Sequence, residues 1–132
     1  MKIALDAMGG DNAPDVTVAG ALRAAREFPI DILLVGQREA IEQSLSRYRN
    51  RPPNISIVHA PEVIGMDESP AASIRKKRES SITIGVEMLK RREVEAFVSA
   101  GNTGAVVAAS TLLVGLLAGV ERPGIAILLP GI

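Results

Sequence analysis

The chain has 132 residues, with 15 basic residues balanced by 15 acidic ones, and it contains no cysteine. This length fits one domain with a buried core, and the absence of cysteine excludes disulfide frameworks, thiolate metal sites and a thiol nucleophile. The balanced charge gives no overall field that would attract nucleic acid or an anionic membrane, so any anion site must be local. The first apolar run ends at Asp6 and is too short for a secretory signal, which predicts a protein that stays inside the cell.

Short aliphatic runs alternate along the chain with longer helical patterns. The runs predict strands at residues 2–5, 30–35, 55–59, 96–99 and 124–129. The segments between them predict helices at residues 14–28, 37–49, 71–78, 81–92 and 105–117. Because strands joined by helices take right-handed crossovers, we expect an α/β fold with three layers, α/β/α, and a mainly parallel sheet. Ligands bind such sheets beyond the carboxyl ends of the strands.

The loop after the first predicted strand reads Asp6-Ala7-Met8-Gly9-Gly10-Asp11. Its glycines Gly9 and Gly10 permit positive φ angles and a close backbone approach, so N–H groups there can face an anion. A carboxylate repels phosphate, so we expect Asp6 and Asp11 to orient basic side chains rather than touch the ligand. The same pattern also fits an ordinary turn in which Asp11 or Asn12 caps the next helix.

A basic segment, Arg75-Lys76-Lys77-Arg78, precedes Ser80 and Ser81. Arginine binds phosphate through two parallel N–H groups, lysine supplies a compact charge, and serine hydroxyls at a helix start can donate. On a helix Arg75 and Arg78 share one face, so at most two of the four cations are expected to reach one ligand. A solvated helix face explains the same cluster, and that interpretation stays open. Ser80 or Ser81 is also expected to cap the following helix.

The loop at residues 99–104 reads Ser-Ala-Gly-Asn-Thr-Gly and is the most informative of the three. Its small residues keep the turn open, and Asn102 and Thr103 offer side-chain donors at the start of an apolar helix. Such a loop can hold an anion, or stabilise an oxyanion during a reaction. The alternative is simple capping of the helix by Asn102, with the glycines serving tight packing of helix and sheet.

These motifs, in this order, closely resemble the bacterial phosphate acyltransferase family of phospholipid synthesis. The resemblance runs from residue 2 to the end of the chain and rests on four stretches: residues 6–11, residues 75–81, residues 99–105 and Glu121-Arg122-Pro123. Members of that family are more than twice as long, so the resemblance implies that residues 1–132 are the N-terminal portion of a single acyltransferase domain. The chain departs from the family pattern at Gly131, where Thr is usual.

The resemblance implies that the complete protein transfers a long acyl chain from acyl carrier protein to inorganic phosphate, which gives an acyl phosphate for phospholipid synthesis. It also implies a cytoplasmic homodimer that associates peripherally with the inner face of the cell membrane through segments beyond residue 132. The implied fold is similar to that of the isocitrate and isopropylmalate dehydrogenases. Nothing in the sequence indicates a metal, a redox cofactor or a nucleic-acid partner.

In the implied reaction a phosphate oxygen attacks the thioester carbonyl, so no protein nucleophile is needed. We expect Asn102 and donors near Thr103 to stabilise the tetrahedral oxyanion. The residues expected to hold phosphate are Arg75, Lys77, Ser80 and Ser81. The other expected cleft positions are Asp6, Gly9, Gly10, Asp11, Ser99, Gly101 and Gly104.

Two other functions remain open from the residues alone. One is a related, phosphotransacetylase-like acyltransferase that uses coenzyme A thioesters of short acids. The other is a non-catalytic domain that senses a phosphorylated ligand. A preference for acetyl-coenzyme A as acyl donor would indicate the first alternative. Tight ligand binding without formation of acyl phosphate would indicate the second.

Overall fold

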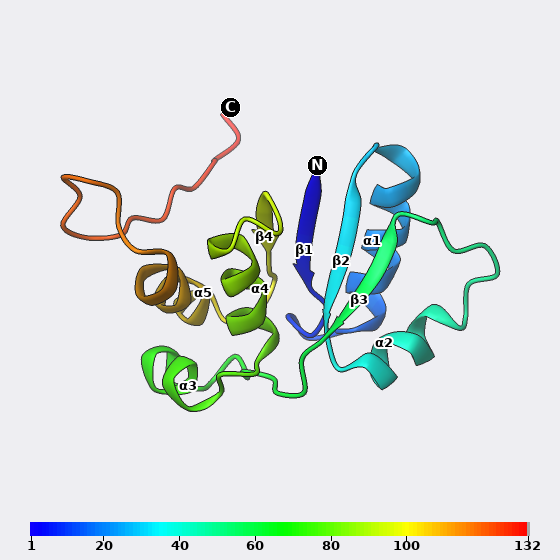
Figure 1. The fold of residues 1–132 in the computed structure, drawn as a ribbon, viewed down its shortest axis with the longest axis horizontal. Helices are drawn as coiled ribbons and strands as arrows, with labels where there is room; N and C mark the ends of the chain where they lie inside the picture. The colour runs from blue at the N-terminus through cyan, green and yellow to red at the C-terminus, as the bar shows by residue number, and fades with distance from the viewer. Residues whose placement is uncertain (132) are drawn as a thin grey trace.

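The computed structural model describes residues 1–131 and contains a four-stranded parallel sheet in the order β3-β2-β1-β4 (Figure 1). The strands are β1 (Lys2–Asp6), β2 (Asp31–Gly36), β3 (Ile55–His59) and β4 (Ala96–Val98). β1 is central, with β2 on one side and β4 on the other. The predicted α/β class with a parallel sheet is therefore confirmed.

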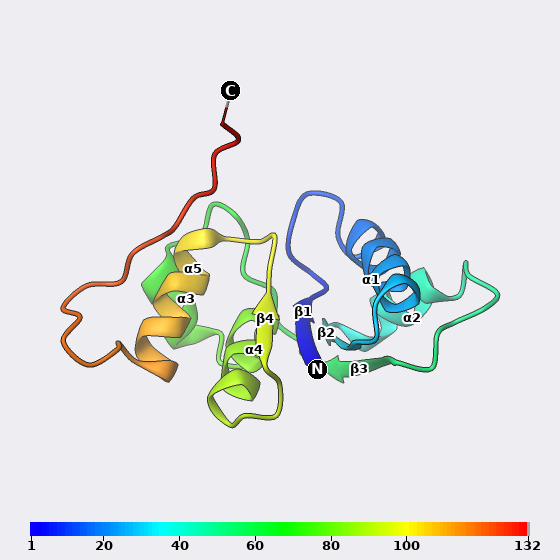
Figure 2. The same cartoon turned by 90° about the horizontal axis from the view of Figure 1, so that it is seen from above.

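Helices cover both faces of this sheet, as Figure 2 shows from above. Helices α1 (Asp15–Glu27) and α2 (Arg38–Leu45) lie on one face, and α4 (Ser81–Lys90) lies on the other. β2 shows why the strands are aliphatic throughout: Leu34 packs in the cluster with α1 and α2, while its neighbour Val35 packs in the cluster with α4. Both side chains are fully buried, because successive residues of a strand point to opposite faces.

Two short helices extend the α4 side of the molecule. They are α3 (Pro70–Lys76) and α5 (Thr103–Ala109), which pack against each other and share an apolar cluster with α4. Gly85 of α4 lets this layer approach the sheet, because a Cβ there would collide with the ring of Phe97 in β4. Figure 1 shows α3 near the lower end of the sheet, where the strand arrows point. The long connection from β3 to α3 runs along the same end.

The C-terminal part of the chain differs from the sequence expectation in two ways. The predicted fifth strand at residues 124–129 is wrong, since these residues form no ladder and their apolar side chains are exposed, as at Ile125 (62%) and Leu128 (99%). A strand that is apolar on both faces needs a covering layer on each side, and no described element covers this segment. The predicted helix 105–117 begins earlier, at Thr103, and ends in a π-helical turn at Ser110–Val114 before Gly115.

Within residues 1–131, no helix combines the length and the apolar character that crossing a bilayer requires.

Candidate functional site

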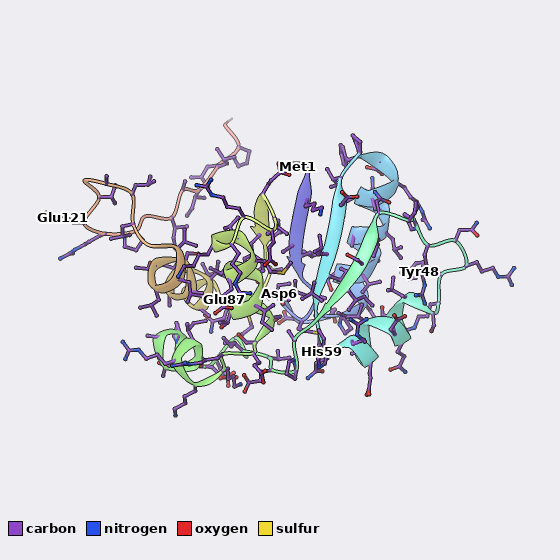
Figure 3. All side chains as sticks on the ribbon, viewed as in Figure 1. Met1, Asp6, Tyr48, His59, Glu87 and Glu121 are labelled. Atoms are coloured by element: carbon purple, nitrogen blue, oxygen red, sulfur yellow. The ribbon has the colours of Figure 1, made fainter. Side chains whose placement is uncertain are left out.

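Hydrogen bonds join the ends of β1 and β4, which are neighbouring parallel strands. Asp6 is the last residue of β1, is 1% exposed, and lies at the carboxyl end of the strand in Figure 3. Its Oδ1 accepts a hydrogen bond from Met8 N at 3.0 Å, and its Oδ2 accepts one from Ser99 Oγ at 2.7 Å. The Ser99 oxygen in turn accepts one from Gly101 N at 3.0 Å. Asp6 therefore fixes both loops relative to the sheet.

Glycine at positions 9 and 101 lets the two loop backbones meet. A Cβ added at Gly9 would lie 2.6 Å from Asp6 Oδ2 and 2.7 Å from Gly101 N. A Cβ added at Gly101 would lie 3.3 Å from Gly9 Cα. Gly10 follows with a φ of +102°, which L side chains rarely adopt. These three predicted positions thus lie together, in a backbone arrangement that excludes larger residues.

Lys77 follows α3 and is held by two acceptors. Its Nζ donates to Glu68 Oε1 at 2.6 Å and to Val63 O at 2.7 Å. An ammonium group has three N–H donors, so one remains for a ligand. The Lys77 side chain is 32% exposed, which leaves its ammonium within reach of solvent.

The carboxylate that contacts Lys77 is not one of those expected. Asp6 and Asp11 were expected to orient the cations, but Asp6 is engaged by its own loop and Ser99, and Asp11 is exposed and forms no ion pair within residues 1–131. Glu68 takes this place, and sequence reasoning missed it because the acidic loop at residues 60–70 offered no motif. Its position two residues before Pro70, which starts α3, is the signal that could have identified it.

Asn102 caps α5 as predicted and also ties the β3–α3 loop to that helix. Its Oδ1 accepts a hydrogen bond from Ala105 N at 3.1 Å, and its Nδ2 donates to Gly65 O and Glu68 O at 3.1 Å each. The residue is 6% exposed, so its amide is enclosed as well as occupied. Contact between Asn102 and an oxyanion stays a prediction. The adjacent Thr103 is exposed at the start of α5.

Ser80 and Ser81 lie inside the protein at the start of α4. Ser80 caps that helix as predicted, because its Oγ accepts a hydrogen bond from Thr83 N at 3.1 Å and donates to Thr83 Oγ1 at 2.9 Å. Ser80 is fully buried and Ser81 is 2% exposed. Their contact with phosphate stays a prediction, and the geometry gives Ser80 a capping role.

The other two predicted positions lie on or beside α3. Arg75 is exposed on α3, and its side chain forms no hydrogen bond or ion pair within the part of the chain that the structure describes. Gly104 lies where α5 meets α3, and a Cβ there would lie 2.6 Å from Pro70 Cγ. The structure therefore forms two groups that meet at residues 101–102. The first holds Asp6, Gly9, Gly10, Ser99 and Gly101, and the second holds Lys77, Asn102 and Gly104 with Glu68.

Hydrogen bonds to the Glu68 carboxylate lower its pKa from the ordinary 4.5 to about 2. The hydrogen bond from Lys77 contributes most, followed by those from Gly65 N and Ser73 Oγ. Because the pKa is lower in the folded state, ionised Glu68 stabilises the fold above pH 4.5, and this contribution is lost as the pH falls toward 2. We expect the difference in unfolding free energy between wild type and Glu68→Gln to be constant at neutral pH and to shrink over that acidic range. Urea unfolding at a series of pH values measures it, and a difference independent of pH would contradict the assignment.

Comparison with known proteins identifies the family. The sequence pattern of a family described as "Fatty acid synthesis protein" matches residues 1–132. The chain belongs to this family. The resemblance noted in the sequence is thereby confirmed at the family level.

Curated relatives of this chain carry a more specific name. A phosphate acyltransferase of Akkermansia muciniphila is 52% identical over 132 residues, covering 98% of this chain and 38% of the relative. A phosphate acyltransferase of Gloeothece citriformis is 46% identical over 131 residues, covering 99% of this chain and 37% of the relative. A third, from Dictyoglomus turgidum, is 49% identical over 130 residues, covering 98% and 39%. The chain thus spans well under half the length of these relatives.

Proposed function

We propose that the complete protein containing this chain is a phosphate acyltransferase, which moves an acyl group from a thioester to inorganic phosphate. The observation that carries the proposal is the match of the whole chain to relatives of that name. The site is compatible with it, because Lys77 keeps one N–H donor beside two tightly tied loops. Cations and oriented donors are what phosphate and a developing oxyanion require.

In the proposed reaction a phosphate oxygen attacks the thioester carbonyl carbon and forms a C–O bond. The tetrahedral intermediate collapses, the C–S bond breaks, and the sulfur leaves as a thiolate with the bonding electrons. Lys77 and Arg75 bind the phosphate, while donors at Thr103 face the oxyanion. Asn102 acts by holding the β3–α3 loop against α5, since its amide is already occupied. Positioning of this kind accelerates a bimolecular step because the reactants no longer pay the full cost of meeting in solution.

The finer parts of the proposal concern substrates and setting. We infer that acyl carrier protein delivers a long acyl chain and that the acyl phosphate enters phospholipid synthesis, in line with the family description. The proposal also includes a homodimer in the cytoplasm, peripheral association with the inner face of the membrane, and an overall fold similar to the isocitrate and isopropylmalate dehydrogenases. The parallel sheet with helices on both faces is compatible with that fold.

The decisive experiment supplies the complete protein with acyl carrier thioester and labelled phosphate. The expected product is labelled acyl phosphate that hydroxylamine destroys. A preference for acetyl-coenzyme A as donor would instead identify a short-chain enzyme. That result would overturn the long-chain, carrier-protein donor but not the transfer to phosphate. Tight calorimetric binding of phosphate without any acyl phosphate would identify a sensor and would overturn the whole proposal.

Substitution of Lys77 tests the phosphate contact. Lys77→Met removes the ammonium but keeps a side chain of similar length, and we expect the KM for phosphate to rise about tenfold, as loss of a hydrogen bond to a charged group implies. The matched control is Lys76→Met, because Lys76 is exposed on α3 and lies outside both groups. Steady-state kinetics at varied phosphate measure the effect. Equal KM values for the two variants would remove Lys77 from the phosphate site.

A further inference from the structure

Glu68 connects three parts of the molecule through one residue. Its carboxylate accepts hydrogen bonds from Lys77 Nζ at 2.6 Å, from Gly65 N at 2.8 Å and from Ser73 Oγ of α3 at 3.0 Å. Its backbone carbonyl accepts one from Asn102, the residue that caps α5. The Glu68 carboxylate therefore contacts α3 and Lys77, while the Glu68 backbone contacts Asn102 at the start of α5. No other carboxylate within residues 1–131 has hydrogen bonds to as many different residues.

The arrangement fixes the direction of the Lys77 ammonium. Two of its three N–H groups point to Glu68 Oε1 and Val63 O, and these acceptors lie on the same loop. A lysine side chain has four rotatable carbon–carbon bonds and would otherwise sample many positions. Two fixed acceptors restrict the third N–H to a single direction.

The hydrogen bonds of Glu68 to Gly65 N and Ser73 Oγ stabilise the fold, but they do not require the contact with Lys77. The Lys77 and Glu68 side chains are both 32% exposed, and ion pairs that water reaches contribute little to folding. A cation prepared for an anionic ligand, in contrast, must be oriented before the ligand arrives, because ordering it later weakens binding. The contacts of Glu68 provide that order.

We propose that Glu68 is a positioning residue for phosphate, which acts by holding the Lys77 ammonium so that its remaining N–H faces the ligand. This inference rests on the proposed function, since it assigns Glu68 a part in the same site. Glu68 acts only through Lys77 and does not contact phosphate, because like charges would repel. Its effect must therefore disappear when Lys77 is absent.

A double-mutant cycle tests this dependence on the complete protein. We expect Glu68→Gln, which keeps the size of the side chain but removes its charge, to raise the KM for phosphate about fivefold while kcat changes less. In the Lys77→Met background the same substitution should leave the KM unchanged. The matched control is Glu42→Gln, because Glu42 forms a comparable ion pair with Arg51 at 3.0 Å, away from both groups. An equal rise in KM in both backgrounds, or no rise in wild type, would overturn the inference.

A binding measurement separates this inference from the proposed function. Added phosphate should raise the Tm of wild type. Lys77→Met should reduce this rise by the same amount as the double variant, and Glu68→Gln should reduce it by less. If that pattern holds but no acyl phosphate forms, the positioning role stands and the proposed function fails. If acyl phosphate forms but the two substitutions act additively on KM and Tm, the function stands and the positioning role fails.

Discussion

Replacement of Gly9 by alanine is expected to damage both stability and turnover. The new Cβ would lie 2.6 Å from Asp6 Oδ2 and 2.7 Å from Gly101 N, so one of the two loops must move. Neither atom can move easily, because Asp6 Oδ2 belongs to a buried carboxylate and Gly101 N donates a hydrogen bond to Ser99 Oγ. We expect a loss of about 1–3 kcal/mol in unfolding free energy, as is usual for overpacked interiors. If the two loops line the proposed site, their displacement by about 1 Å should lower turnover roughly 100-fold.

The matched control is the same substitution at Gly20. This glycine lies in α1, and a Cβ there has nothing within 4 Å. Gly20→Ala should therefore stabilise the protein by about 0.5–1 kcal/mol, because alanine favours helix more than glycine does. Urea unfolding and acyl phosphate formation measure both variants. If Gly9→Ala behaves like Gly20→Ala, the two loops do not approach each other as closely as the structure has them.

Features determined by nearby residues could be predicted from the sequence. Ser80 and Asn102 cap their helices as expected, because a cap needs only a side-chain acceptor and the N–H two or three residues later. Gly10 also follows from local sequence, because its φ of +102° is one that glycine adopts readily. The parallel direction of the strands also follows from sequence, since alternating strands and helices allow few topologies.

Features determined by distant residues were missed. The contact between Glu68 and Lys77 depends on the path of the β3–α3 loop, which no pattern in the sequence fixes. The fifth strand failed for a related reason, because residues 124–129 have the composition of a buried strand but form one only beside a partner and under covering layers. The basic segment shows both effects: its helix was predicted, but only the fold shows that Lys77 is held and Arg75 is exposed.

Substitution of Asn102 is expected to have the second large effect, and two variants separate its roles. Asn102→Ala removes the cap on α5 and the hydrogen bonds from the amide to the β3–α3 loop, which should cost about 1–3 kcal/mol in unfolding free energy. Asn102→Asp keeps an oxygen for Ala105 N, so the cap survives, but it places a carboxylate against the carbonyls of Gly65 and Glu68. The aspartate should therefore keep the helix and release the loop that carries Glu68.

Kinetics of the same two variants decide how Asn102 serves the reaction. If it holds the loop, both variants should raise the KM for phosphate, because Glu68 and Lys77 lose their fixed position along with the loop. If its amide instead reached the oxyanion, kcat would fall by about 100-fold or more while the KM stayed near that of wild type. The occupied amide predicts the first result. A fall confined to kcat would show that the Asn102 amide breaks its hydrogen bonds to the β3–α3 loop during turnover. The amide would then donate to the oxyanion, as the sequence predicts.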